Sequence, residues 1–155
     1  MLPIRVIDLR KMKLMKNFTP LPSEEDEEFY PNGIFVFNIS KLIQYINKNQ
    51  EVFQPEEVPV NILASFRSPN IDEATIKTAE LSVPIIMAEI APYQFNVIDG
   101  HHRLEKARRE EKTVILAYKV PAEHHVRFLN SIKAYVAYVE YWNNKLKERK
   151  KYNAI

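Results

Sequence analysis

The sequence predicts an α/β protein of the α+β type, in which a small mixed sheet carries flanking helices and a long C-terminal helix. Short apolar runs at 84–90, 95–98 and 114–120 have the length and composition of buried strands. Residues 100–111 and the residues after Pro121 have helical character instead. Strands and helical segments that alternate in this way are typical of a sheet covered by helices.

The composition bounds the class of protein. With 155 residues, 46% of them hydrophobic, the chain is long enough for one domain with its own core. We therefore expect a single domain over 1–155, with a core at about 33–120 and a helical extension at 121–150. The absence of cysteine excludes disulfides, thiolate metal sites and cysteine nucleophiles. A formal net charge of +2 neither requires nor excludes a nucleic-acid partner.

No stretch of the sequence predicts a membrane segment. No apolar run approaches the roughly 18 residues that indicate a transmembrane helix. The N-terminal residues 1–16 are basic, but they lack the apolar region and the cleavage site of a signal peptide. The prediction is a soluble, cytoplasmic protein.

The first third of the chain predicts two strands separated by a loop. Ile4–Leu9 alternates like a strand, and Gly33–Phe37 indicates a second one. Between them, Ser23–Glu28 brings like charges together, and such a block usually lies in a solvated loop. We therefore expect 17–32 to be the most mobile internal segment.

A helix should follow the second strand. Asn38 or Ser40 can cap it, because their side chains accept a hydrogen bond from the first-turn amides. Its inward face would hold Leu42, Ile43 and Ile46.

The middle of the chain predicts a turn, a loop and a short helix. Pro55 and Pro59 bracket a turn ahead of 60–63, and 65–70 is a polar loop. Asp72 is a good cap for a short helix through Leu81.

The most regular part of the sequence runs from Pro84 to Val120. Pro84–Ile90 predicts a strand buried on both faces, and a tight connection at 92–94 leads into the strand Phe95–Ile98, which suggests a hairpin. A helix over Gly100–Glu111 and a strand over Val114–Val120 follow.

The residues after Pro121 predict a long helix with one apolar stripe. The stripe residues recur at spacings of four and three; they are Phe128, Ile132, Tyr135, Val139, Trp142 and Leu146. The stripe is expected to pack on the sheet, and the alternative is a homodimer seam along 128–146. The last turns, 145–151, are basic, as suits a helix C-terminus.

The main candidate site is the corner Asp99–Arg103, where a strand gives way to a helix. His101, His102 and Arg103 stand where a helix dipole favours negative charge, so an anion such as phosphate would complete the turn. Gly100 would let a ligand approach the backbone closely. Asp99 would cap the helix or hold Mg²⁺ beside phosphate oxygens. The alternative is structural: Asp99 caps, one histidine packs, and Arg103 pairs with a carboxylate.

Two further groups are weaker candidates. Arg67, in the loop 65–70, could contact the same anion, and the alternative is an exposed loop residue. His124 and His125 do not chelate together, since adjacent helical residues point apart, but one of them could form a divalent-metal triad with Asp99 and with His101 or His102 if the fold brought it to the corner.

The motif at this corner resembles a known superfamily. The stretch Phe95–Ala107, with Asp-Gly-His-His-Arg between a strand and a helix, looks like the signature box of the ParB/sulfiredoxin superfamily. ParB proteins have a Gly-Glu-Arg-Arg-type box there, sulfiredoxins Gly-Cys-His-Arg, and free serine kinases Asp-Gly-His-His-Arg. The likeness covers roughly Gly33–Trp142 and is greatest to small stand-alone bacterial proteins described as ParB N-terminal-like.

The resemblance implies a nucleotide-binding domain, with phosphates held at the box. Asp99, His101 and His102 would act in catalysis, and Gly100, His101, His102, Arg103 and Arg67 would bind the nucleotide. The activity would be phosphotransfer, as in an ATP- or ADP-dependent kinase of a small molecule, or nucleotide hydrolysis. The kinases place a catalytic glutamate in the N-terminal part of the fold, for which Glu51, Glu56 and Glu57 are equal candidates.

Departures from the family narrow the expectation. Sulfinic acid reduction needs the box cysteine, and His101 stands in its place. Only about 35 residues follow Val120, too few for the helix-turn-helix domain of a partition ParB, and no Glu-Asn-x-x-Arg motif is present. The remaining alternatives are a DNA-associated accessory protein or weak nuclease, and a non-catalytic oligomerising domain.

Overall fold

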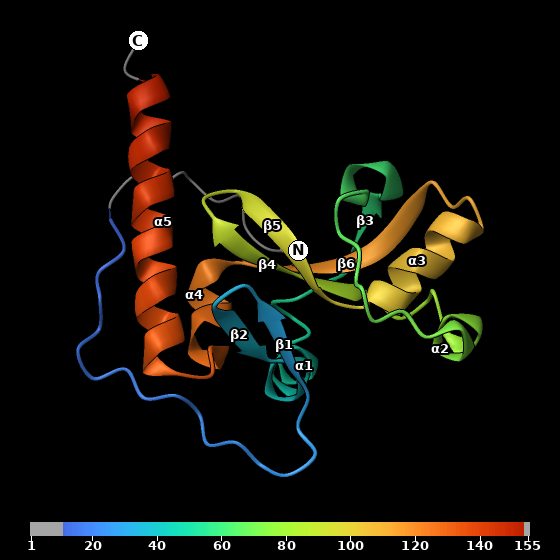
Figure 1. Cartoon of the computed structure of the whole chain (residues 1–155), viewed down its shortest axis with the longest axis horizontal. Coiled ribbons are helices and arrows are strands. Elements are labelled where there is room, and N and C mark those ends of the chain that lie inside the picture. The colour runs from blue at the N-terminus through green and yellow to red at the C-terminus, as the bar shows by residue number, and fades with distance from the viewer. Residues whose placement is uncertain (1–10, 154–155) are drawn as a thin grey trace.

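A four-stranded mixed sheet lies at the centre of the molecule, as the sequence predicted (Figure 1). The computed structural model describes residues 11–153, with side chains up to residue 149. The strands lie in the order β3 (Glu56–Pro59), β6 (Val114–Val120), β4 (Ile85–Ala91) and β5 (Gln94–Asp99). β4 and β6 are parallel, whereas β3–β6 and β4–β5 are antiparallel.

The central strand β4 is buried on both faces along its whole length. Ile85 and Met87 belong to one apolar cluster, and Ile86, Ala88 and Ile90 belong to another. Successive side chains of a strand point to opposite faces, so this alternation places one cluster on each side of the sheet. The prediction of a strand buried on both faces is confirmed.

Helices α3 (His101–Arg109) and η1 (Val60–Leu63) cover one face of the sheet. Leu104 and Ala107 of α3 and Leu63 of η1 are buried there against β4 and β6. A short helix, α2 (Glu73–Thr78), packs beside α3. Asp72 occupies its N-cap position, where its carboxylate accepts a hydrogen bond from the Thr75 hydroxyl at 2.5 Å. The predicted helix ends earlier than Leu81.

The opposite face is covered by α1 (Ile39–Lys48), by a hairpin and by the C-terminal helices. Asn38 caps α1, because its Oδ1 accepts a hydrogen bond from the Lys41 amide at 3.0 Å. Leu42 and Ile46 are fully buried and Ile43 is partly buried, as the sequence predicted.

The hairpin joins β1 (Phe29–Asn32) to β2 (Phe35–Asn38) and corrects the prediction of a mobile loop through residue 32. Gly33 stands at the first position of the two-residue turn with a φ of +63°, a conformation that suits glycine in hairpins. The acidic segment before it is exposed except at Glu27, whose carboxylate contacts Lys41 at 3.1 Å and Asn38 at 3.0 Å.

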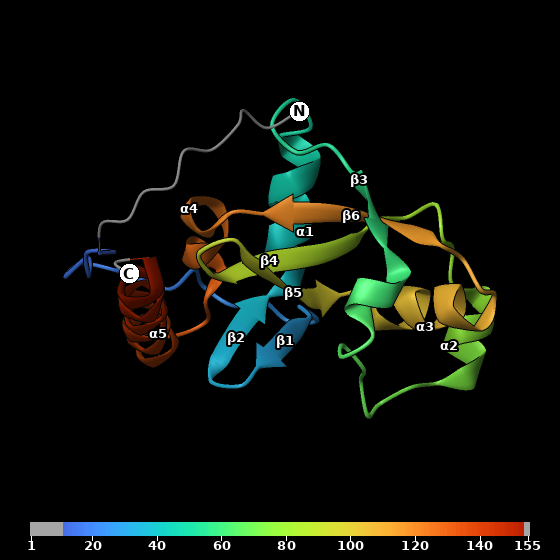
Figure 2. The ribbon, with the colours of Figure 1, turned by 90° about the horizontal axis from the view of Figure 1, so that it is seen from above.

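The C-terminal region is not one continuous helix from residue 128. The chain forms α4 (Ala122–His125) and η2 (Val126–Phe128), turns, and begins α5 (Ile132–Asn153) after Ser131. The Ser131 hydroxyl accepts a hydrogen bond from the Ala134 amide at 3.0 Å, which fixes the helix start. Figure 2 shows α5 and the α2–α3 pair at opposite ends of the sheet.

The predicted stripe of α5 is buried within the chain's own core. Tyr135, Val139, Trp142 and Leu146 are 1–5% exposed, whereas Ile132 is 59% exposed. Residues 12–18 run along the same helix, where Phe18 stacks on Tyr135 with ring centroids 4.1 Å apart.

Glu89 connects β4 to the C-terminal helices. Its buried carboxylate accepts hydrogen bonds from the Tyr93 amide at 2.8 Å and from the Ala122 amide at 3.1 Å. Its backbone carbonyl accepts from His125 Nε2 at 2.6 Å and from the Tyr138 hydroxyl at 2.7 Å. One residue of β4 therefore joins the β4–β5 turn, α4 and α5.

Three further predictions have different outcomes. The turn expected between Pro55 and Pro59 is instead the edge strand β3, paired with β6. The strand expected at Ile4–Leu9 lies outside the described residues. Among the described residues, no helix has an apolar stretch long enough to span a bilayer.

Candidate phosphate-binding corner

The corner is formed where β5 ends at Asp99 and α3 begins at His101. Gly100 joins them with a φ of +97°, which residues with a side chain rarely adopt. A Cβ on Gly100 would lie 2.5 Å from Ile85 Cγ2 and 2.8 Å from Arg103 Nη2. The fold itself therefore requires glycine here, because neighbouring side chains of the same chain fill the space that a Cβ would occupy.

Arg103 and Asp99 form an ion pair across the first turn. Arg103 Nη2 lies 3.2 Å from Asp99 Oδ2 and donates to the Pro84 carbonyl at 3.3 Å. Asp99 does not cap α3, whose N-cap residue is Gly100. The Nε–H of Arg103 is buried and has no hydrogen-bond partner. A buried donor without an acceptor is unfavourable, and because this atom is closed off from solvent, an anion could reach it only if neighbouring side chains moved aside.

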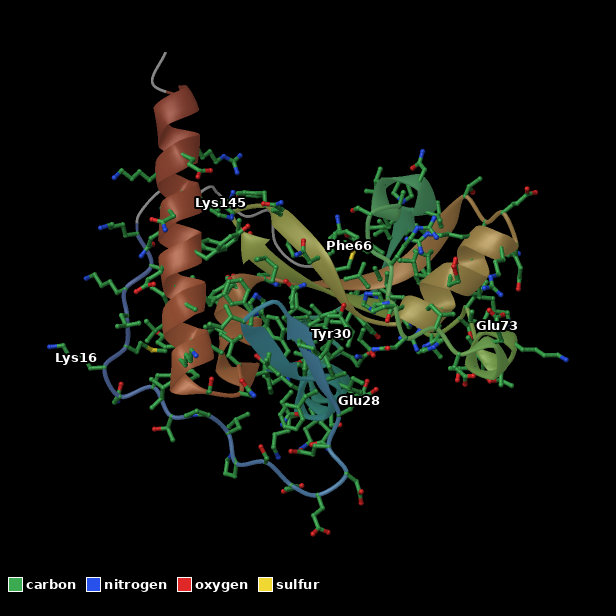
Figure 3. All side chains as sticks on the ribbon, in the orientation of Figure 1. Lys16, Glu28, Tyr30, Phe66, Glu73 and Lys145 are labelled. Atoms are coloured by element: carbon green, nitrogen blue, oxygen red, sulfur yellow. The ribbon has the colours of Figure 1, made fainter. Side chains whose placement is uncertain are left out.

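His101 packs against the β1–β2 hairpin. Its ring stacks on Tyr30 with centroids 5.0 Å apart and an interplanar angle of 23°, and its Nε2 lies 3.2 Å from the Tyr30 hydroxyl. Burial lowers the pKa of His101 below its usual value, and nearby Asp99 opposes this effect. The imidazole is therefore predominantly neutral at pH 7. Tyr30, labelled in Figure 3, was not predicted as a site residue.

His102 contacts the segment that leads into α2. Its Nε2 accepts a hydrogen bond from the Asp72 backbone amide at 3.1 Å. The two histidines of the motif are thus held by two different elements, β1 for His101 and the N-cap of α2 for His102. The structural alternative is met in part, since one histidine packs and Arg103 pairs with Asp99.

Arg67 lies over the middle of α3. It is exposed, and its Nη1 is 3.7 Å from the Glu105 carboxylate. Arg108, one turn further along α3, fixes the start of this loop by donating to the carbonyls of Leu63 at 2.5 Å and Phe66 at 2.8 Å. Arg67 therefore contacts the middle of α3 through Glu105, and this contact does not bring it to Asp99 or Gly100.

The three glutamates considered as a catalytic base are all exposed, and the two on β3 lie away from the corner. Glu56 and Glu57 are on β3, which is separated from β5 by β6 and β4. Three strand spacings amount to roughly 14 Å. Glu56 pairs with Lys119 at 3.1 Å, and Glu51 follows the end of α1. The strand order therefore keeps Glu56 and Glu57 from Asp99.

The second histidine pair has structural contacts. His124 Nδ1 lies 3.0 Å from the Tyr45 hydroxyl, and His125 is fully buried beside Glu89 and Tyr138. Burial lowers the pKa of His125 to about 4. Within residues 11–153, no three His, Asp or Glu side chains gather as a metal site would require, so the triad with Asp99 does not form.

The basic end of α5 makes contacts within the chain. Arg149 donates to the Pro92 carbonyl at 3.1 Å and lies over the Tyr93 ring, and Lys145 is 3.5 Å from Glu148. These contacts do not favour a DNA-binding surface over ordinary packing, and DNA association stays a prediction.

The sequence contained signals for some of the residues that were missed. Asn32-Gly33, flanked by aromatic residues, is a hairpin signal that would have placed Tyr30 on a strand. No local signal joins Tyr30 to His101, which is 71 residues away in the chain. Comparison with protein-family models, with curated proteins and with solved structures gave no significant match.

Proposed function

We propose that this protein binds a nucleoside phosphate at the Asp99–Arg103 corner. The observation that carries the proposal is the buried Nε–H of Arg103. This donor has no acceptor, and its residue stands in the first turn of α3. The first amides of a helix also lack intrahelical acceptors. A phosphate would satisfy these donors and the positive end of the helix dipole together.

The order of elements supports a place in the ParB/sulfiredoxin superfamily. The box follows strand β5, opens helix α3 and precedes strand β6, and the partner strand β4 pairs with β5. This is the layout that the resemblance of the motif implies. The absence of matches to known families leaves the motif and this order of elements as the support for the assignment.

The residues of the corner suit a nucleotide bound with Mg²⁺. Asp99 Oδ2 contacts Arg103, so Oδ1 is the candidate ligand atom for the ion. Magnesium in nucleotide sites is commonly held by one or two carboxylates, phosphate oxygens and water. A single carboxylate at the corner fits this pattern, and His101 and His102 would contact phosphate oxygens.

Calorimetry with ATP, ADP, CTP and GTP, each with and without Mg²⁺, tests the proposal. We expect at least one nucleotide to bind with a Kd below millimolar. Arg103→Gln should weaken binding about tenfold, the equivalent of one charge-assisted hydrogen bond of about 1.4 kcal/mol. Arg109→Gln is the matched control, because it removes the same charge from the other end of α3, where Arg109 pairs with Glu73.

Two results would count against nucleotide binding. One is the absence of heat with every nucleotide up to millimolar concentration. The other is equal weakening by Arg103→Gln and Arg109→Gln, which would indicate an effect of net charge alone. Circular dichroism of both variants checks that the loss of the Asp99 contact has not unfolded the corner.

The reaction is then determined by following the terminal phosphate. A nucleotide hydrolase releases inorganic phosphate with no added acceptor. A phosphotransferase transfers phosphate only when a small hydroxyl compound is supplied. Asp99→Asn should abolish either activity while leaving Mg²⁺-free nucleotide binding measurable.

A further inference from the structure

Residues 11–18 form a strap that lies along the side of α5 facing away from the sheet (Figure 1). Hydrogen bonds of its backbone attach it to the helix. The Met12 backbone exchanges two hydrogen bonds with the Asn143 side chain, and the Met15 amide donates to the Tyr135 hydroxyl at 2.9 Å. Because the backbone makes these bonds, the side chains in the middle of the strap are left to face outward.

Two exposed apolar side chains stand among lysines on the strap. Leu14 is 48% exposed and Met15 is 51% exposed. Lys11, Lys13 and Lys16 are exposed as well, and the strap contains no acid. Figure 3 shows the Lys16 side chain pointing away from α5. Apolar and cationic side chains are therefore interleaved on the surface of one short segment.

The side of α5 beside the strap has the same character. Ile132 is 59% exposed, and Val136, one turn further along the helix, is partly buried. Lys133, next to Ile132, is exposed. Val136 and Leu14 line the same cavity between the helix and the strap, which has a volume of about 690 Å³. The apolar side chains of the strap and of the first turns of α5 therefore belong to one surface.

A second cavity, of about 600 Å³, extends this surface toward the C-terminal end of α5. Lys11 and Lys147 line it. Within the described part of the chain, Glu140 is the one acid in the walls of the two cavities. Glu148, beside Lys147, is 3.5 Å from Lys145, which offsets its charge. Positive charge therefore exceeds negative charge along the whole face.

We propose that the strap and the adjoining side of α5 form a docking surface for an anionic lipid bilayer. Leu14, Met15 and Ile132 enter the boundary between headgroups and acyl chains, and the surrounding lysines lie among the negative headgroups. Binding of this kind draws on buried apolar area and on attraction to anionic lipid together, and the face offers both. The contact lies at the bilayer surface and requires no spanning helix.

Two other partners fit this face less well. In a twofold dimer the same surface of each copy faces the other, so the lysines of both copies would be brought together and would repel. A nucleic acid would use the lysines for its phosphates but would leave the exposed apolar side chains in water. An anionic bilayer is the partner that uses both kinds of side chain.

Co-sedimentation of the full chain with vesicles tests the lipid preference. Vesicles of phosphatidylcholine and phosphatidylglycerol in equal parts should bind the protein, and vesicles of phosphatidylcholine alone should bind it at least about tenfold more weakly. Binding to the mixed vesicles should also weaken as salt is added, because salt screens the attraction between lysines and headgroups. Equal binding to both kinds of vesicle, or binding to neither, would overturn the proposal.

Two triple variants locate the charge that binds the lipid. A lysine near an anionic surface contributes about fivefold to binding, so the loss of three should weaken binding on the order of a hundredfold. One variant removes three lysines from the strap, and its control removes three exposed lysines from other elements. The strap variant is Lys11→Gln, Lys13→Gln and Lys16→Gln, and the control is Lys48→Gln, Lys77→Gln and Lys112→Gln. Equal weakening by the two variants would mean that net charge alone is at work, and would exclude a specific face.

Because the chain has no cysteine, a single introduced one can report which face meets the lipid. A polarity-sensitive dye is attached to Met15→Cys or to Ile62→Cys, an exposed control position on η1. The emission of the dye at position 15 should shift to the blue when mixed vesicles are added, and that of the dye at position 62 should not. Leu14→Gln combined with Met15→Gln should weaken binding about tenfold. A dye response at both positions, or at neither, contradicts docking through the strap.

Duplex DNA and nucleotides separate this proposal from the others. DNA binding that the strap variant abolishes, without any binding to vesicles, would assign the lysines to a nucleic acid instead. Nucleotide binding should be unchanged in the strap variant, because α3 lies at the opposite end of the sheet from α5 (Figure 2). The docking surface is therefore independent of the proposed nucleotide site, and each can fail without the other.

Discussion

Contacts at the corner differ in how far apart their partners lie in the sequence. The Asp99–Arg103 pair has a spacing of only four residues, so the sequence could offer this local contact as one alternative for Arg103, although Asp99 belongs to β5 and not to the helix. The partners of His101 and His102 lie 71 and 30 residues away, and only the folded chain brings them together. The motif therefore predicted which residues form the corner, but it could not predict their protonation.

Gly100 is expected to be far more sensitive to alanine than Gly33. Gly100→Ala combines a left-handed backbone with a Cβ only 2.5 Å from Ile85 Cγ2, and should destabilise the protein by roughly 2–4 kcal/mol. Gly33→Ala has a similar φ with nothing within 4 Å, and should cost about 1 kcal/mol. Urea unfolding of both variants measures the difference. Equal losses would show that packing against Ile85 contributes nothing.

His125 should make the protein less stable in acid. Burial lowers its pKa in the folded state to about 4, below the usual 6.5. The unfolded chain therefore takes up a proton at a higher pH than the folded chain does, so stability is full above about pH 6.5 and falls as the pH drops toward 4. The loss attributable to this residue is at most roughly 3 kcal/mol.

Comparison with His125→Gln isolates this contribution. Glutamine can still donate to the Glu89 carbonyl but does not titrate, whereas His101 and His124, whose pKa values are also lowered by burial, remain in both proteins. Chemical unfolding at several pH values between 4 and 7 should give a flatter profile for the variant. Parallel profiles would exclude His125 as a source of acid sensitivity.

At the scale of elements, the strands that were predicted correctly are those whose own residues are mostly apolar. β4, β5 and β6 were placed to within one residue at each end, because proline, glycine and polar residues bound them clearly. β3 contains two glutamates and a proline, and only Val58 is buried. It is a strand because it pairs with β6, and this long-range pairing leaves no periodic signal within four residues.

Glu89 should be essential to the attachment of α4 to the sheet. In Glu89→Gln an NH₂ group replaces one of the two carboxylate oxygens. The remaining oxygen can accept from only one of the Tyr93 and Ala122 amides, and the other amide loses its acceptor. We expect a loss of roughly 2–3 kcal/mol from the buried amide left without an acceptor. Tyr138→Phe, which removes one donor from a carbonyl that His125 also contacts, should cost about 1 kcal/mol. Thermal unfolding monitored by circular dichroism compares the two, and a smaller loss for Glu89→Gln would be contrary to this assignment.

At the scale of the molecule, the sheet separates two apolar clusters with different neighbours. The cluster under α3 supports the candidate phosphate corner, and the cluster under α1 and α5 holds the long helix. Met12 and Phe18 pack against the second cluster, and the Met12 backbone exchanges two hydrogen bonds with the Asn143 side chain at 2.8 and 3.0 Å. The apolar stripe of α5 could be predicted from its spacing, whereas its partner could not, since a seam between two chains requires the same pattern.

Two positions on α5 distinguish an internal role of the stripe from a homodimer seam. Leu146 is 1% exposed and Ile132 is 59% exposed, although both belong to the same stripe. If the stripe serves the chain's own core, Leu146→Ala should lower stability by about 2–5 kcal/mol, and Ile132→Ala should change it by less than about 1 kcal/mol. The melting temperature of the wild type should also be independent of protein concentration, because no association is coupled to folding. Two results together would instead assign the exposed start of the stripe to a contact between two copies. The melting temperature would rise with protein concentration, and light scattering would give a dimeric mass that Ile132→Ala converts to a monomeric one.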